Sequence, residues 1–190
     1  RHSAGQIDDV ELKEIEDCAC PGPGACGGQF TANTMATALE FIGLSAMGTA
    51  SVPAVDEAKR EVGRHVGELA MKTLYEGRRP QDVLTRDSFE NAIASVAATG
   101  GSTNAVLHLL ALADEAGVHL ELEDFDRVSE ATPLYADMMP SGKYSAFELF
   151  HAGGTRLVAK RLLDAGKLNA ECTTVTGRTI AEETAEAVER

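Results

Sequence analysis

Three of the four cysteines of this chain lie within nine residues, at Cys18, Cys20 and Cys26. The stretch that carries them is rich in glycine and proline and leads directly into an expected helix. Thiolates on such a backbone bind soft metals and iron–sulfur clusters, and a helix N-terminus favours the thiolate form. The C-x-C-x5-C spacing fits neither a zinc-finger nor a ferredoxin pattern well. Metal or cluster binding and simple burial of small apolar side chains therefore stay about equally open, and a catalytic cysteine has no evident histidine partner.

A second candidate site is the segment Gly100-Gly101-Ser102-Thr103-Asn104, which separates two expected helices. Glycine amides and hydroxyls at a helix N-terminus suit a carboxylate or a phosphate. A plain helix–helix turn with a serine or threonine cap is the more common use of such a segment. The turn Pro140-Ser141-Gly142-Lys143 is a weaker candidate of the same kind.

The five histidines are scattered and show no paired metal-ligand spacing. His108 lies in an apolar segment, which predicts a hydrogen-bonded core residue rather than a metal ligand. His151 precedes two glycines and is expected in a turn. The acidic residues form no pair specific enough to predict a catalytic dyad.

The composition excludes some classes of partner. A net charge of −13 argues against nucleic acid or an anionic membrane surface, since both require a basic face. No apolar run approaches the length of a membrane span. Clustered cysteines in a chain of 190 residues do not resemble a secreted disulfide framework, which favours a reducing, cytoplasmic location. The start lacks an initiator Met and an apolar leader, so we expect an interior piece of a longer protein.

The elements that must position these residues are mainly helices. Apolar residues recur at helical spacing, and glycines and prolines mark the breaks between the helices. The pattern predicts helices over 7–17, 30–44, 56–75, 85–98, 105–116, 124–130, 145–150, 156–165 and 179–190. The β-branched run 173–176 is the only persuasive strand, with Gly177 completing a short hairpin. The chain is therefore expected to be predominantly α-helical with few short strands.

Caps and buried faces follow from the same patterns. N-caps are expected at Thr85 and at either Thr31 or Asn33. The buried stripe of the helix 85–98 is expected to consist of Phe89, Ile93 and Val96. In the helix 56–75, the residues expected to face inward are Val62, Val66, Leu69 and Leu74 or Met71. The helix 105–116 is apolar nearly all round and is expected to lie centrally.

The twelve residues from Gly24 to Met35, GACGGQFTANTM, resemble a signature of the dihydroxy-acid dehydratase and 6-phosphogluconate dehydratase family. Further stretches agree with that family in order: Leu84-Thr85-Arg86, Phe89-Glu90-Asn91-Ala92, Gly100 to Leu109, Pro140 to Tyr144, Leu162 to Gly166 and Thr174 to Thr179. The resemblance covers essentially the whole chain. The sequences of these stretches are most similar to those of the dihydroxy-acid dehydratases.

The resemblance implies a hydro-lyase that removes water from a small 2,3-dihydroxy carboxylic acid to give a 2-keto acid, in branched-chain amino acid biosynthesis. It implies an iron–sulfur cluster, of 2Fe–2S or 4Fe–4S type, and a Mg²⁺ whose ligands lie outside this chain. The implied fold is an α/β N-terminal domain followed by a β-rich C-terminal domain. Residues 1–166 are expected to belong to the first, and 167–190 to form a linker towards the absent second. A homodimer or higher homo-oligomer is also implied.

Only one cofactor ligand of the family falls within this chain, because Cys26 alone matches a cluster cysteine. Cys18 and Cys20 match no ligand position, and Cys172 is expected to be structural. The residues expected to line the substrate or cluster pocket are Gly101, Ser102, Thr103 and Asn104, and Thr31 and Asn33 are expected to shape the helix start behind Cys26. No catalytic residue is expected in this chain, which alone should be inactive. The alternatives are a sugar-acid dehydratase, of 6-phosphogluconate or aldonate type, and a non-catalytic helical module that binds a metal or a partner.

Overall fold

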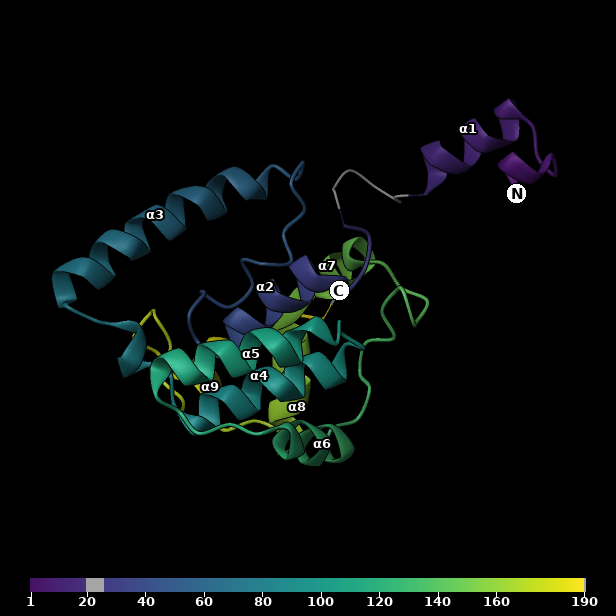
Figure 1. The fold of residues 1–190 in the computed structure, drawn as a ribbon. Helices are drawn as coiled ribbons and strands as arrows, with labels where there is room; N and C mark the ends of the chain where they lie inside the picture. Colours follow the sequence, from purple (N-terminus) through teal and green to yellow (C-terminus); the bar gives the residue numbers. More distant parts are fainter. Residues whose placement is uncertain (20–25, 190) are drawn as a thin grey trace.

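The computed structural model describes residues 1–19 and 26–189. Its elements are η1 (His2–Ala4), α1 (Asp9–Cys18), α2 (Thr31–Phe41), α3 (Ala58–Glu76), η2 (Pro80–Asp82), α4 (Arg86–Ala98), α5 (Asn104–Ala116), α6 (Leu122–Ala131), α7 (Ala146–Ala152), α8 (Gly154–Asp164) and α9 (Ile180–Thr184). Figure 1 shows their arrangement. The expectation of a predominantly helical chain is confirmed. The α/β fold of a whole family member stays a prediction.

Local chemistry explains where several helices begin. The Thr85 hydroxyl accepts a hydrogen bond from Ser88 N (3.2 Å), and the Ser88 hydroxyl accepts one from Thr85 N (2.9 Å). This reciprocal capping confirms the expected N-cap of α4. The expected cap at Thr31 or Asn33 is wrong, because Phe30 occupies the N-cap of α2 and no side chain caps that helix.

The principal core lies between α2, α4, α5 and α6 (Figure 1). Phe89 and Ile93 are buried as expected, and Val96 is half-buried against the same cluster. The other buried members include Ala38, Ile42, Ala92, Leu109, Ala113, Phe125 and Val128. Small alanines let the helices approach closely, and the larger side chains fill the space between them.

Helix α5 is less central than its composition predicts. Its buried residues are Ala105, Leu109 and Ala113, which share one face. Leu107 is 68% exposed on another face, and His108 is exposed as well. The expected core role of His108 is therefore wrong, since nothing in the described part of the chain covers that side of α5.

A second core joins α8 and α9 to the end of α2. Phe41, Met47, Val158, Leu162 and Ile180 are buried in it. Residues 168–184 thus pack against the body, and a domain boundary at residue 166 with a segment leading to a second domain stays a prediction. The short hairpin expected around Gly177 is present as a turn with the bridge Thr173–Thr179. Within the described residues, this bridge does not extend into a longer strand. Helix α9 covers only part of the expected helix 179–190.

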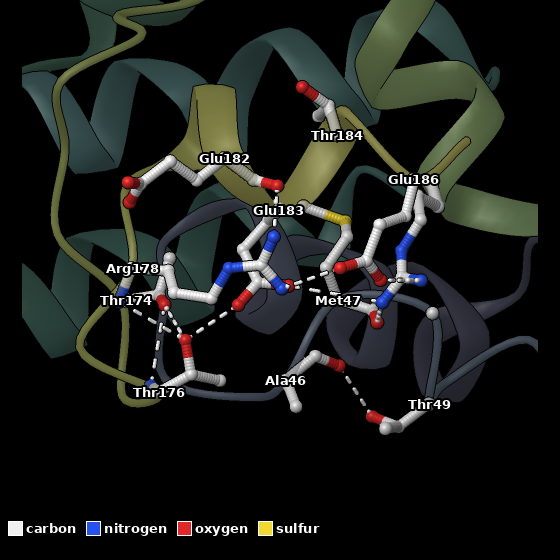
Figure 2. A network of polar contacts seen from close by, with 12 residues as sticks. Ala46, Met47, Thr49, Thr174, Thr176, Arg178, Glu182, Glu183, Thr184 and Glu186 are labelled. Atoms are coloured by element: carbon white, nitrogen blue, oxygen red, sulfur yellow. Dashed lines mark hydrogen bonds and ion pairs between the residues drawn. The ribbon is translucent and has the colours of Figure 1, made fainter.

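Polar contacts fasten this C-terminal segment (Figure 2). The buried Glu183 carboxylate accepts a hydrogen bond from the Thr176 hydroxyl (2.6 Å) and lies 3.8 Å from the Arg156 guanidinium. Arg156 also donates to Met47 O (2.7 Å). Glu186 pairs with both Arg156 (3.3 Å) and Arg178 (3.0 Å). The segment 176–186 is therefore bound to α8 and to the loop after α2.

Helix α3 buries no residue and stands away from the body in Figure 1. Val62 and Leu69 are half-buried, whereas Val66 is 45% exposed and Leu74 is 69% exposed, so the expected inward face of this helix is confirmed only in part. A helical stripe of apolar residues predicts burial only where another element covers it, and within the described residues none covers this stripe fully. None of the described helices combines the length and apolar character needed to cross a membrane.

Candidate functional site

Cys26 is half-buried at the entrance to α2 and lines a cavity of about 300 Å³. The loop 26–29 lies between the start of α2 and the segment before α7. The Asn33 side chain, one turn into α2, donates from Nδ2 to Cys26 O (3.0 Å) and to Gly28 O (2.8 Å). The expectation that Asn33 shapes the helix start behind Cys26 is thereby confirmed, through carbonyls rather than as a cap.

The two glycines after Cys26 lie against another segment of the chain. A Cβ at position 28 would lie 2.4 Å from Met139 O, a distance that no side chain tolerates. Gln29 N donates to that same carbonyl (2.6 Å), and Ala146 N donates to Gly27 O (2.9 Å). The loop therefore pairs closely with the segment 139–146, which residue spacing within the motif does not reveal.

Gln29 anchors the other side of the loop. This side chain is buried and donates to the Thr99 hydroxyl (2.9 Å), which in turn donates to Ser95 O (2.8 Å). The Thr34 hydroxyl donates to Gln29 O (3.1 Å). The backbone that carries Cys26 is therefore fixed to α4 as well as to α2.

The glycine segment after α4 meets the cysteine motif at the start of α2. The Asn104 side chain donates to the Thr31 hydroxyl (2.8 Å), and Ser102 N donates to the Thr34 hydroxyl (2.9 Å). A Cβ at Gly101 would lie 2.8 Å from Thr34 Cγ2, so this position also requires glycine. Two motifs far apart in sequence thus form one surface, although the lining of the cavity beside Cys26 comes from other residues. The pocket role of 101–104 stays a prediction.

The other cysteines lie away from this cavity. Cys18 is exposed at the end of α1, and Cys20 falls outside the described residues. Cys172 packs against the second core, and burial raises the pKa of its thiol. Of the described cysteines, Cys26 is thus the one that lines the cavity.

Two further candidates from the sequence, His151 and Lys143, show no arrangement of ligand-binding groups around them among the described residues. His151 lies in the last turn of α7, so its expected place in a turn is wrong, and the helix ends at the glycine pair that follows. Its ring lies edge-on to Phe147 with ring centroids 4.3 Å apart. Lys143, in the weaker glycine turn, is exposed.

Glu40 is a buried carboxylate that sequence reasoning missed. It accepts hydrogen bonds from Gly48 N (3.0 Å), from Ala50 N and from the hydroxyls of Thr49 (3.4 Å) and Thr155. Burial raises the pKa of this carboxyl, and the hydrogen bonds oppose that shift only in part. The acid gathers the loop 48–50 and the start of α8, which contribute to one wall of the Cys26 cavity. In the sequence, Glu40 could have been noticed as a lone acidic residue on the apolar side of α2.

Within the described ranges, no group of three or more His, Cys, Asp and Glu side chains comes together as a metal site. Cys26 therefore fits a cluster as a single ligand: the residue lines a cavity, and the loop 26–29 that carries it is bonded to α2, to Thr99 and to the segment 139–146. The remaining ligands of such a cluster would have to come from other residues.

Comparison with known proteins agrees along nearly the whole chain. The family model described as dihydroxy-acid/6-phosphogluconate dehydratase N-terminal matches residues 1–183. A protein of Roseiflexus sp. (strain RS-1) named dihydroxy-acid dehydratase is 64% identical over 187 residues, which are 98% of this chain and 34% of that protein. A protein of the same name from Thermus thermophilus is 58% identical over 96% of this chain and 33% of its own length. The chain thus spans about a third of the length of the curated relatives it matches.

Proposed function

Because the chain belongs to the dihydroxy-acid/6-phosphogluconate dehydratase family, we propose that it forms part of a hydro-lyase that converts 2,3-dihydroxy carboxylic acids to 2-keto acids. The observation that carries the proposal is the 64% identity over 98% of this chain to a protein named dihydroxy-acid dehydratase. The names of the similar relatives favour this activity over a sugar-acid dehydratase and over a non-catalytic binding module.

Cys26 is proposed as one ligand of an iron–sulfur cluster, of 2Fe–2S or 4Fe–4S type. When bound, such a cluster supplies a Lewis-acidic iron for the departing hydroxyl group. Support comes from the half-buried thiol at the cavity and from the fixed backbone around it. Mg²⁺ is proposed to be held by residues outside this chain.

The residues of this chain would position rather than perform the chemistry. Asn33 and Met139 hold the loop that presents the Cys26 thiol. The segment 101–104 is proposed to border the substrate, because it contacts the same helix start through Thr31 and Thr34. Unchanged substrate affinity after substitution of Thr103 in the full-length enzyme would count against that role.

Three broader proposals follow: a cytoplasmic location, a homodimer or higher homo-oligomer, and a place in branched-chain amino acid biosynthesis. The thiols of Cys18, Cys26 and Cys172 are free, which agrees with a reducing compartment.

The test uses the full-length enzyme, meaning a protein of the relatives' length that contains this chain, purified without oxygen. We expect cluster absorbance and activity on 2,3-dihydroxyisovalerate, and loss of both in Cys26→Ser. The matched control Cys172→Ser should keep both, since that thiol packs in the second core. A colourless, inactive wild-type enzyme would contradict the proposal. Activity on 6-phosphogluconate alone would favour the sugar-acid alternative.

A further inference from the structure

One buried carboxylate connects two residues that line the cavity beside Cys26. Ala50, in the loop after α2, lines that cavity and donates its backbone N–H to Glu40. Thr155, in the first turn of α8, lines it as well and donates its hydroxyl to the same carboxylate. Glu40 itself is 0% exposed and is not among the described residues that line the cavity. Glu40 can therefore influence the cavity only through its neighbours, of which Ala50 and Thr155 are two.

Donors from two elements converge on the Glu40 carboxylate. Gly48 N (3.0 Å), Ala50 N and the Thr49 hydroxyl (3.4 Å) come from the loop after α2, and the Thr155 hydroxyl comes from α8. A carboxylate accepts hydrogen bonds on both of its oxygens. The amide of glutamine has the same shape but one oxygen, and its NH2 group would face a donor. Glu40→Gln should therefore leave at least one part-buried donor without a partner and loosen the loop.

The same loop lies directly against the start of α8. A Cβ at Gly154 would lie 2.7 Å from the Ser51 Oγ, so the absence of a side chain there makes the close approach possible. Ser51 also lines the cavity beside Cys26. Glu40 belongs to α2, whose first turns hold the backbone of Cys26 through Asn33. One carboxylate thus fixes the loop and α8 relative to the helix that supports Cys26.

Glu183 is a second buried carboxylate and provides a comparison. It is 3% exposed and accepts a hydrogen bond from the Thr176 hydroxyl (2.6 Å). It lies 3.8 Å from the Arg156 guanidinium. Glu183, Thr176 and Arg156 line a different cavity, and none of the three is among the described residues that line the cavity beside Cys26. The two acids therefore match in burial and differ in what they hold.

We propose that Glu40 is a positioning residue that fixes Ala50 and Thr155 in the lining of the cavity beside Cys26 and so restricts access to the Cys26 thiol. This inference rests on the proposed function, because the thiol matters to the reaction only as a cluster ligand. Glu40 takes part in no chemical step. Its loss should allow local opening of the loop and expose the thiol to reagents from solvent.

The test measures access to the Cys26 thiol in the full-length enzyme, without its cluster. In Glu40→Gln we expect iodoacetamide to alkylate Cys26 about fivefold faster than in the wild type, since loss of about one hydrogen bond eases local opening by such a factor. Cys172 should keep its rate, because it packs against the second core. Glu183→Gln is the matched control and should leave the rate at Cys26 unchanged, even where it lowers the melting temperature.

A second variant tests the same contact if Glu40→Gln does not fold. Thr155→Val keeps the shape of the side chain and removes its hydroxyl, so alkylation of Cys26 should again be faster. Thr155→Ser restores the hydroxyl and should return the rate to near that of the wild type. In the cluster-loaded enzyme, Glu40→Gln should lose cluster absorbance in air faster than Glu183→Gln does.

Two results would overturn the proposal. One is an unchanged rate at Cys26 in every Glu40 and Thr155 variant that folds. The other is an equal acceleration at Cys26 and Cys172, since this would report opening of the whole chain rather than of one loop. Neither result concerns the proposed function, which fails separately if the wild-type enzyme holds no cluster and is inactive.

Discussion

The loop 26–29 and helix α3 stand at opposite extremes of this molecule. The four loop residues are held by backbone or side-chain groups from α2, α4 and the segment 139–146. The 19 residues of α3 include none that is buried. Regular structure and tight anchoring are thus separate properties here. An irregular loop can be the better determined part when its polar backbone groups find partners.

Glycine has opposite meanings in these two regions. Gly28 lies against a carbonyl that leaves no space for a side chain. Gly63 and Gly67, in the middle of α3, have nothing within 4 Å of a built Cβ. The first glycine permits a contact, whereas the other two only weaken a helix.

The largest contrast should appear in side-chain truncation. We expect Phe89→Ala to lower the free energy of unfolding by about 4 kcal/mol, because it leaves a cavity in the principal core. Leu74→Ala on α3 should change it by less than about 0.5 kcal/mol, since that side chain is exposed. Urea denaturation followed by circular dichroism measures both. A comparable loss in the two variants would mean that α3 is covered in solution.

Replacing glycine by alanine should change the free energy of unfolding by a nearly comparable amount, but in opposite directions in the two regions. Gly28→Ala should cost about 3 kcal/mol, because its Cβ must displace the Met139 backbone. Gly63→Ala should stabilise the chain by about 1 kcal/mol, since a glycine inside an exposed helix is replaced by a better helix former. The same urea titrations provide the values. A tolerated Gly28→Ala would show that the loop yields more readily than its contacts indicate.

Asn33→Ala should cost about 2 kcal/mol, because the carbonyls of Cys26 and Gly28 lose their shared donor. Alkylation of the Cys26 thiol should also become faster relative to the exposed Cys18, as mass spectrometry of iodoacetamide-treated protein reports. Asn104→Ala, which removes one bond to Thr31, is the milder control. Equal alkylation rates in wild type and Asn33→Ala would argue against a positioning role.

The smallest effect concerns pH. The Glu40 carboxyl has a raised pKa in the folded chain, so the native state binds more protons than the unfolded state above the ordinary value of 4.5. The contribution of Glu40 to stability is complete below that value and is lost as pH rises through the raised pKa. Glu40→Gln should therefore lose less stability than the wild type as pH rises above the ordinary value of 4.5. Glu14→Gln on α1 is the exposed control. Parallel pH profiles for wild type and Glu40→Gln would contradict this account.

Part of the local chemistry was readable from the sequence, although the N-cap of α2 was not, and neither was the cover that one element gives another. The N-cap at Thr85 and the stripe of Phe89 and Ile93 depend on neighbours within one turn or two, so they were predicted correctly. Burial of Val66 and His108 depends on whether another element lies above them, which periodicity does not report. For this reason Val66 and His108 were both wrongly expected to be buried.

The candidate site divides in the same way. Cys26 and the segment 101–104 were singled out from residue type and spacing. The partnership of Gly28 with Met139 and the contact between Glu40 and Thr155 arise only when distant segments meet. Gln29 could have been suspected as a polar residue between two buried elements, but its partner Thr99 could not.

Asn33 and Thr34 are near neighbours of the loop 26–29, but its other partners lie far downstream of it in the sequence. Thr99 is 70 positions beyond Gln29, and Met139 and Ala146 follow later still. A chain leaving the ribosome therefore exposes Cys26 long before these downstream partners have been synthesised. The thiol reaches its folded surroundings only after Ala146 has emerged.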